Sequence, residues 1–352
     1  MTENKIQDII KTTRISRNEN VAEEQPILTI SGATVMSSGN ISAFIGKPKS
    51  KKTFGVELFM RVILTSKKNS NLINDNSFFS TRKRIIWFDT EQSRGLVKKI
   101  ETRLIEVYNT FNIPIEVYSL RPLSVSERID VITQILYTGN ENHDIAIAVI
   151  DGIRDLVTDI NDAKQATEIL SLLMRITDNT KMHIATVLHV NKSDNNARGH
   201  LGTELVNKAE TVMLVEKDSK TEHISYITPE HTRQGSFKPI TFYIDENICP
   251  KAITQKEANI ILAQNSPFAD MTEIEHKKTI VRVYRDQEEL LYSELLDRTS
   301  KVTKKGDALA RQLKEIWISQ DFITHNGQRG KAARYKINFQ LNYVDEINTN
   351  YD

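Results

Sequence analysis

Short apolar runs alternate with longer amphipathic segments over the first half of the chain. The apolar runs, which are rich in β-branched and aromatic residues, span 41–45, 84–89, 115–120, 145–151 and 183–190. The amphipathic segments between them, which have helical spacing, span 51–66, 93–111, 124–139 and 163–177. Strands that alternate with helices are typical of βαβ units. The pattern therefore predicts an α/β fold with a mostly parallel, twisted sheet that is flanked by helices.

The segments on either side of this pattern set the expected domain boundaries. Three further apolar runs, with little helical sequence between them, predict antiparallel strands that extend the sheet; they lie at 209–218, 222–228 and 239–245. The first 25 residues are polar and carry no β-rich run, which predicts a partly disordered arm over 1–25. Pro250 and Pro267 interrupt a mixed polar stretch, which predicts a linker over 247–272. The sheet domain is thus expected over 26–246.

The last block of the chain, over 273–346, has the pattern of a small separate domain. Its three helical stretches lie at 274–286, 288–300 and 306–320. The apolar pair Phe322-Ile323 then leads through a Gly-containing turn into a short strand at 333–338. Three helices followed by a hairpin describe a winged helix-turn-helix domain.

Composition narrows the classes of protein to which the chain can belong. It has 352 residues and a formal net charge of +1, so any affinity for nucleic acid must be local. No apolar run approaches the roughly 20 residues that a membrane helix needs, and the N-terminus has no apolar signal segment. The single cysteine, Cys249, excludes an internal disulfide and a cysteine-based metal cluster. We therefore expect a cytoplasmic protein without membrane partners.

The stretch "IGKPKSKKTFGVELF", at 45–59, follows the phosphate-binding loop pattern G-x-x-x-x-G-K-[ST] with one departure. Gly46 opens the pattern and Lys52-Thr53 closes it, between a predicted strand and a predicted helix. That context favours a nucleotide site over a Lys-rich surface turn, because backbone N–H groups and the helix N-terminus bind phosphate together. Lys52 is expected on the β- and γ-phosphates of ATP, and Thr53 on Mg²⁺. The predicted nucleotide contacts are Gly46, Lys47, Pro48, Lys49, Ser50, Lys51, Lys52, Thr53 and Phe54.

Lys51 is the departure, because it stands where the pattern has its second glycine. Glycine allows a backbone geometry and a close approach that a Cβ atom impedes. An outward-pointing lysine side chain is compatible with anion binding. The substitution therefore bears more on fast turnover than on nucleotide binding.

Two acidic positions at the ends of predicted strands complete the candidate catalytic set. Asp151 ends the run "IAIAVID" and is expected to hold Mg²⁺ through water, opposite Thr53. Glu91 follows the run at 84–89, where it is placed to act as the base that polarises an attacking water. From spacing alone, a role for Glu91 as the cap of the helix that follows is equally compatible.

A histidine and an arginine later in the sheet domain each allow two interpretations. His189 ends the run at 183–190, so it faces either a γ-phosphate as a sensor or only its packing neighbours. Arg233 lies in a turn between two late strands, where it is either solvated or directed at a phosphate on a neighbouring subunit as an arginine finger.

Taken together, these residues resemble the RecA/DnaB-like ATPases, most closely the RepA-type hexameric helicases of plasmids and mobile elements. The resemblance covers roughly 26–246 and rests on the order of the residues: Lys52-Thr53, Glu91, Asp151, His189 with the Arg198-Gly199 loop, and Arg233 in "HTRQGSF". Lys51 in place of glycine and His231 in place of the usual basic residue depart from the family pattern.

The resemblance implies a RecA-like P-loop ATPase that uses ATP and Mg²⁺, forms a homo-oligomeric ring and acts on DNA. Lys52, Glu91, His189 and Arg233 would be its catalytic residues. The loop after His189 would face DNA, with Lys192, Arg198 and His200 as candidate contacts.

The C-terminal block adds a local positive charge. Residues 301–338 hold nine Lys or Arg and three acidic residues, a surplus of six positive charges. This favours phosphate contacts on a recognition helix and wing over a domain that binds only protein. The candidate DNA contacts are Lys304, Lys305, Arg311, Arg329 and Lys331.

Our main hypothesis is an ATPase that acts on DNA, as a helicase or a replication or mobilisation motor of a plasmid or mobile element. The alternative is a nucleotide-gated DNA-binding regulator with a degenerate loop and little hydrolysis. A P-loop fold that binds no nucleotide is the third interpretation.

Overall fold

The computed structural model describes most of the chain, and every statement below concerns those residues. They are 3–21, 23–65, 74–75, 84–106, 115–137, 144–191, 197–218, 221, 223–254, 257–258, 261, 268, 270–285, 287–328 and 332–339.

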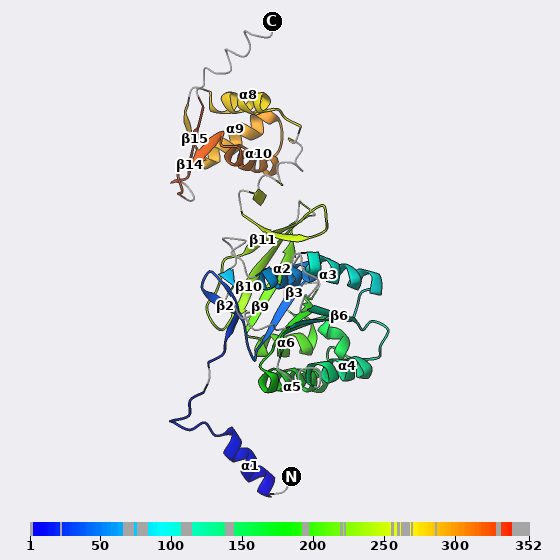
Figure 1. Ribbon diagram of the computed structural model, residues 1–352. Helices are drawn as coiled ribbons and strands as arrows, with labels where there is room; N and C mark the ends of the chain where they lie inside the picture. Colours follow the sequence, from blue (N-terminus) through cyan, green and yellow to red (C-terminus); the bar gives the residue numbers. More distant parts are fainter. Residues whose placement is uncertain are drawn as a thin grey trace.

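A nine-stranded, mostly parallel sheet forms the centre of the fold (Figure 1). Its strands are β3 (Ile41–Gly46), β5 (Arg84–Asp89), β6 (Ile115–Ser119), β7 (Ile145–Asp151), β8 (His183–His189), β9 (Thr211–Lys217), β10 (Ile224–Thr232), β11 (Ile240–Ile244) and β12 (Pro250–Ile253). Their order across the sheet is β12-β11-β10-β9-β3-β8-β7-β5-β6. The first five strands of the sheet in chain order confirm the predicted apolar runs. One strand, β8, separates β3 from β7.

The late strands differ in part from the sequence prediction. β10 and β11 are antiparallel to their neighbours, as predicted. β9, which was expected to be antiparallel, pairs parallel with β3, because the chain crosses over through a helix before entering it. β12 lies inside the segment predicted as a linker and pairs with β11.

Helices cover both faces of the sheet (Figure 1). They are α2 (Lys52–Thr65), α3 (Arg94–Glu106), α4 (Val125–Tyr137), the 3₁₀ turn η3 (Ile153–Leu156), α5 (Ala163–Thr180) and α6 (Gly199–Lys208). Buried side chains of α2 and α3 share one core with Phe44 of β3, whereas those of α4, α5 and α6 share a second core with Ala43 and Ile45. Successive side chains of a strand point to opposite faces, so β3 is buried from both sides.

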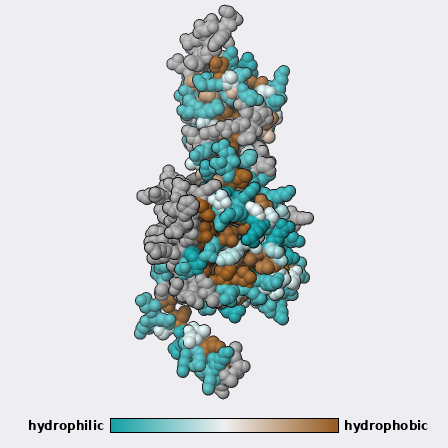
Figure 2. Space-filling view, turned by 45° about the vertical axis from the view of Figure 1, so that its right-hand side comes forward, coloured by the Kyte–Doolittle hydropathy of each residue, from teal (hydrophilic) through white to brown (hydrophobic). Residues whose placement is uncertain are grey.

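The surface is polar except for patches of apolar side chains. Figure 2 shows hydrophilic side chains over most of the described surface, with apolar ones gathered on the main body. The exposed large apolar side chains include Leu96, Ile105 and Ile248. Among the described helices, none combines the length and apolarity needed to cross a membrane.

Two N-terminal elements were not predicted. A helix, α1 (Glu3–Thr13), occupies part of the segment expected to be a partly disordered arm. The hairpin of β1 (Pro26–Ile30) and β2 (Ala33–Ser37) forms a small antiparallel sheet with β4 (Asn74–Asp75). Its strands were missed, although Ser31 and Gly32 between them both have positive φ angles, as a tight hairpin turn requires.

Buried polar side chains fasten this hairpin to the large sheet. The Glu210 carboxylate accepts hydrogen bonds from the backbone N–H and the hydroxyl of Ser37 at 3.0 and 2.7 Å. His183, fully buried, places Nδ1 2.9 Å from the Ser37 carbonyl and Nε2 2.9 Å from the Ser42 hydroxyl. Because a carbonyl can only accept, Nδ1 carries the proton, and Nε2 of the neutral ring accepts from Ser42.

The C-terminal residues form a unit with its own core (Figure 1). Its elements are α8 (Glu273–Tyr284), β13 (Glu289–Leu291), α9 (Tyr292–Thr303), α10 (Asp307–Ser319), β14 (Ile323–His325) and β15 (Arg334–Ile337). The three strands form an antiparallel sheet in the order β13-β15-β14. The three predicted helices are present, but Glu289–Leu291, which was assigned to the second helix, is a strand.

The burial of His183 makes the stability of the fold depend on pH. Burial lowers the pKa of His183 to about 4 from its ordinary 6.5. Between these two values the unfolded chain binds a proton that the folded chain does not, so stability falls as the pH falls from 6.5 toward 4. Between pH 7 and pH 5 we expect the wild type to lose about 2 kcal/mol more than His183→Gln, measured by urea unfolding at pH 7, 6 and 5. Equal slopes for the two proteins would contradict the assignment.

Candidate functional site

The carboxyl ends of four parallel strands surround one cavity of about 520 Å³. β3, β5, β7 and β8 deliver their following residues to this edge of the sheet, where open α/β sheets bind ligands. The volume lies within the usual range for small-molecule sites. The cavity is lined by Lys49, Lys51, Lys52, Thr53, Phe54, Asp89, Glu91, Gln92, Leu96, Lys99, Arg103, Asp151, Arg154, Val187, Leu188, His189 and Ile248.

The loop between β3 and α2 is held close to the neighbouring strand β9. The backbone N–H of Ser50 donates to the Lys47 carbonyl at 3.2 Å, which closes a tight turn. A Cβ atom at Gly46 would lie 2.3 Å from the Val215 carbonyl oxygen and 2.6 Å from the Ser50 hydroxyl. Only glycine fits at the start of this loop, as the sequence pattern requires.

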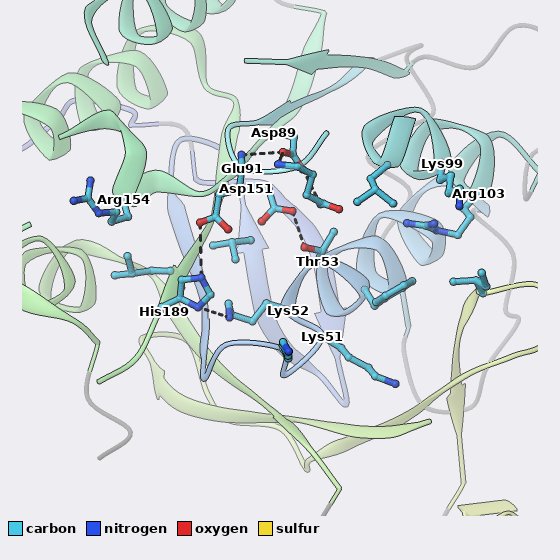
Figure 3. A pocket seen from close by; sticks show the side chains of 17 residues that line it. Lys51, Lys52, Thr53, Asp89, Glu91, Lys99, Arg103, Asp151, Arg154 and His189 are labelled. Carbon is cyan, nitrogen blue, oxygen red and sulfur yellow. Dashed lines mark hydrogen bonds and ion pairs between the residues drawn. The ribbon is translucent and has the colours of Figure 1, made fainter. Parts of the chain in front are cut away.

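Lys51 adopts the backbone conformation of the glycine that it replaces. Its φ angle is +72°, in the left-handed region that side chains with a Cβ atom rarely adopt. In Figure 3 the Lys51 side chain points away from Thr53 and Asp151. The loop therefore has a backbone shape that glycine adopts easily, and the Cβ atom of Lys51 makes this backbone conformation strained.

Lys52 lies at the centre of the site and is almost completely buried. Its Nζ donates to the carbonyls of Gly46 and Lys47, both at 3.0 Å, and lies 2.9 Å from Nδ1 of His189. The ammonium therefore has two carbonyl acceptors and an imidazole nitrogen within hydrogen-bond distance, and an anionic ligand would compete with these contacts. Burial lowers the pKa of Lys52 to about 8, against the opposing effect of Asp151 and Glu91.

Thr53 and Asp151 meet as the sequence predicts. The Thr53 hydroxyl donates to Oδ2 of Asp151 at 2.7 Å. Burial, together with the carboxylate of Asp89, raises the pKa of Asp151 to about 7. A buried carboxylate beside a hydroxyl at the end of a strand is the oxygen donor set that suits Mg²⁺.

The protein ligands available for a metal are few. Among the residues in the described ranges, no group of three or more His, Cys, Asp or Glu side chains is placed to hold a metal ion. Mg²⁺ is commonly bound through one or two carboxylates together with substrate phosphates. Thr53 and Asp151 therefore fit a metal that arrives with a nucleotide.

Glu91 faces His189 and does not cap the next helix. Oε1 of Glu91 lies 3.7 Å from Nε2 of His189 (Figure 3), and this imidazole is the main cause that lowers the pKa of Glu91. Oδ1 of Asp89 accepts from the backbone N–H groups of Glu91 and Gln92 at 3.0 and 2.7 Å, which fixes the turn that precedes α3. Spacing left two roles open for Glu91. The structure excludes the role of helix cap, because α3 begins only at Arg94.

The structure places Arg233, Arg198 and His200 away from this cavity. The guanidinium of Arg233 donates to the carbonyls of Asn207 and Lys208, at the end of α6, at 3.3 and 3.2 Å. Arg198 and His200 are at the start of α6, and His200 lines a separate surface groove. Lys192 lies outside the described residues.

The positive charge of the C-terminal unit is more concentrated than the sequence count suggests. Lys304, Lys305 and Arg311 are exposed around the turn from α9 to α10. Four other basic side chains of the block form ion pairs with acidic neighbours; they are Lys301, Lys314, Arg334 and Lys336. Lys314 is also buried. Arg329 and Lys331 lie outside the described residues.

Nine lining residues were not among the predicted site residues; they are Asp89, Gln92, Leu96, Lys99, Arg103, Arg154, Val187, Leu188 and Ile248. Leu96, Lys99 and Arg103 lie at helical spacing on one face of α3, a signal that becomes readable only once α3 is known to border the site. Arg154 follows Asp151 in η3, and Ile248 comes from the turn between β11 and β12. Nothing in the local sequence marks Ile248 as a site residue.

Comparisons with known proteins yield structural neighbours only. No protein-family model and no curated protein matches the chain. A solved structure of the RadB recombinase is similar at 14% identity over 62% of this chain and 93% of that one, with a TM-score of 0.42. A KaiC-like protein from Pyrococcus horikoshii OT3 is similar at 12% identity over 67% of this chain and 100% of that one, with a TM-score of 0.46. At these scores the function of the cavity has to be argued from this chain's own residues.

The strain at Lys51 predicts that glycine stabilises the protein. A residue with a Cβ atom in the left-handed region destabilises the folded state by about 1–2 kcal/mol. Glycine removes this strain, but it also raises the conformational entropy of the unfolded chain, which offsets about 0.4–1 kcal/mol of the gain. Lys51→Gly should therefore raise the free energy of unfolding by about 0.5–1 kcal/mol in urea titrations.

Lys51→Ala is the matched control, because it removes the charge and keeps the Cβ atom. It should not stabilise the protein. If alanine stabilised it as much as glycine does, the effect would come from charge, and the strain assignment would be wrong.

Proposed function

We propose that the chain is a RecA-like P-loop ATPase that acts on DNA. One observation carries this proposal: Lys52, Thr53, Glu91, Asp151 and His189, drawn from the ends of four parallel strands, converge on a single cavity. Packing alone gives no reason for five polar side chains from distant parts of the chain to meet in one hollow. Perturbed titratable groups that gather in a cleft are typical of functional sites.

The geometry supports the following proposed binding roles. The glycine-type loop presents its backbone N–H groups and the start of α2 to the phosphates, and Lys52 supplies a buried positive charge. Thr53 and Asp151 would hold Mg²⁺, which when bound neutralises phosphate charge during transfer. The side chains of Lys52, Asp151 and Asp89 are buried close to one another. We therefore expect the phosphate-bearing ligand and its metal ion to bind together.

Glu91 is the residue best placed to activate water. Its side chain is about half exposed, at 47%, and faces the cavity. The neighbouring imidazole of His189 favours the ionised carboxylate, which can accept a proton from an attacking water. His189 contacts both Lys52 and Glu91, so it is placed to respond when a phosphate displaces the lysine.

Substitutions at Lys52 and Glu91 separate binding from chemistry. Lys52→Ala should abolish measurable ATP binding in calorimetry, because no other side chain replaces the buried ammonium. Glu91→Gln should bind ATP with near wild-type affinity and lose about 10²–10⁴-fold in turnover. Glu101→Gln, a change on the outer part of α3, serves as the control. Wild-type turnover by both site variants would overturn the assignment, whereas wild-type binding without any turnover would favour the nucleotide-gated regulator.

The oligomeric part of the proposal rests on Arg233. Arg233 does not line the cavity of its own chain, and it is exposed directly after β10. We propose that it completes the site of a neighbouring copy in a ring, where an arginine can stabilise transition-state charge. The hexameric ring and the motor role in plasmid or mobile-element replication come from the family resemblance.

The C-terminal unit is proposed to be the winged helix that contacts DNA. Its order α8-β13-α9-α10-β14-β15 matches three helices followed by a hairpin wing. The exposed basic side chains Lys304, Lys305 and Arg311 lie where α10 begins, which suits contacts with phosphates. Lys192, Arg198 and His200 are the proposed contacts on the ATPase domain, and Arg329 and Lys331 those in the wing.

The exposed basic cluster predicts a change in salt dependence. Replacing Lys304, Lys305 and Arg311 together by Ala should weaken duplex DNA binding and reduce the slope of log affinity against log salt by about 2–3. The matched control replaces Lys301 and Lys336, which form ion pairs with Asp297 and Glu288. An unchanged slope in the triple variant, measured by fluorescence anisotropy, would show that DNA does not bind at this corner.

A further inference from the structure

We infer that Gln92 forms part of the outer layer of the magnesium site, where its side-chain carbonyl oxygen accepts a hydrogen bond from a water molecule that the metal ion carries. Asp89 orients the amide of Gln92 for this contact. This role rests on the proposed function, since Thr53 and Asp151 are proposed there to hold the metal. Gln92 is thus a positioning residue and takes no part in the chemical step.

The amide of Gln92 is held in one orientation by Asp89, which is fully buried. Nε2 of Gln92 donates to Oδ2 of Asp89 at 2.7 Å, and the backbone N–H groups of Glu91 and Gln92 donate to Oδ1 of the same carboxylate. Because an ionised carboxylate only accepts, the amide nitrogen must face Asp89, and Oε1 faces away from it. Gln92 is half-buried and lines the cavity, so Oε1 is the part of the amide that a ligand can reach.

The same arrangement occurs a second time in the chain, at the start of α5. Oδ1 of Asp162 accepts from the backbone N–H groups of Lys164 and Gln165, and Nε2 of Gln165 donates to Oδ2 of Asp162 at 2.8 Å. There, Oε1 of Gln165 accepts from the backbone N–H and the hydroxyl of Thr158, at 2.8 and 2.9 Å. The protein itself thus supplies both donors to the carbonyl oxygen of Gln165.

The carbonyl oxygen of Gln92 has no such partner. Within the described part of the chain, neither a backbone group nor a side chain donates a hydrogen bond to it. An amide oxygen that is oriented by a buried carboxylate and open to a cavity is a ready acceptor for a donor on a ligand. The difference between Gln92 and Gln165 therefore points to a ligand contact.

The surroundings of Gln92 indicate which donor this is. Asp89, which holds the amide, is the strand partner of Asp151 on the neighbouring strand β7, and its charge helps to raise the pKa of Asp151. The Thr53 hydroxyl donates to Asp151 at 2.7 Å. Gln92 is therefore separated from the proposed metal ligands by the side chain of Asp89 alone.

The proposed general base faces a different direction. Glu91 turns to His189, 3.7 Å away, and not to Asp89 (Figure 3). A water that attacks phosphate is expected beside Glu91, whereas the amide of Gln92 is on the side of Asp89. This separation favours a water on the metal over the attacking water as the partner of Gln92.

The coordination of Mg²⁺ creates a need for such an acceptor. Mg²⁺ prefers octahedral coordination by oxygen and usually keeps several waters. No group of three metal-binding side chains exists among the described residues, so phosphates and waters must fill the positions that Thr53 and Asp151 leave. The metal polarises these waters, and acceptors around them fix their orientation.

Binding of ADP to the full-length protein, measured by calorimetry in Mg²⁺ and in EDTA, tests this role without turnover. Gln92→Met keeps the length of the side chain and removes the carbonyl. It should raise the Kd of ADP about tenfold in Mg²⁺ and leave the Kd in EDTA unchanged, because contacts around the metal ligands strengthen metal binding by about 10–100-fold. Gln165→Met, the matched control, removes the equivalent hydrogen bond to Asp162 and should change neither value.

Mn²⁺ allows a second measurement on the same proteins. In the presence of ADP, the Mn²⁺ concentration that half-saturates the protein, followed through the EPR signal of free Mn²⁺, should rise about tenfold in Gln92→Met. This comparison also serves if ADP without metal binds too weakly for calorimetry. Gln92→Leu lacks the same carbonyl and should give the same results, so a folding defect of one variant does not decide the outcome.

The outcomes separate the role of Gln92 from the proposed function. Equal weakening of ADP binding in Mg²⁺ and in EDTA would overturn the role, because Oε1 would then contact the nucleotide itself. Unchanged binding with lost turnover would overturn it too, because the contact would be to the attacking water. Both results leave the ATPase proposal in place. If the wild type bound ADP under neither condition, the proposed function would fail as well.

Discussion

The packing of β3 between β8 and β9 is the constraint on which the site depends. β3 is paired on both edges, and both of its faces are covered, so the point where it ends is fixed in three directions. Gly46 sits there against the Val215 carbonyl at a distance that no side chain allows. The fixed position of Gly46 determines where the following loop lies, and the loop places Lys52 in its buried position. Substitutions that displace β3 or its neighbouring strands would therefore displace the site residues more than the residues on the surface.

Ionisable side chains of both signs are buried together in the cavity. Asp89 and Asp151 are both buried at the ends of neighbouring strands, and burial raises the pKa of each. Lys52 is buried beside them, and its pKa is lowered. Buried carboxylates of this kind require hydrogen-bond partners. Thr53 donates to Asp151, and the backbone N–H groups of Glu91 and Gln92 donate to Asp89.

Much of the sheet and of its polar edge could be predicted from the sequence. Strands β3, β5, β6, β7 and β8 follow from apolar runs, and parallel strands necessarily bring their carboxyl ends together. That geometry is why Lys52, Thr53, Glu91, Asp151 and His189 could be grouped before the structure was known. β9 and β13 could not be predicted correctly, because strand direction and short strands depend on partners far away in the chain. The hairpin β1–β2 was also missed, although its strands pair across a two-residue turn. The contribution of Ile248 to the cavity could not be predicted either, since a late hairpin places it there.

Arg233 is attached to the fold at more than one point. Its backbone N–H donates to the Glu210 carbonyl at 3.0 Å, and its guanidinium holds the end of α6. The carboxylate of the same Glu210 accepts two hydrogen bonds from Ser37 of the N-terminal hairpin. A force applied to Arg233 from outside would therefore act on the junction of α6 with β9 and, through Glu210, on the N-terminal hairpin. It would not be absorbed by movement of the turn that holds Arg233.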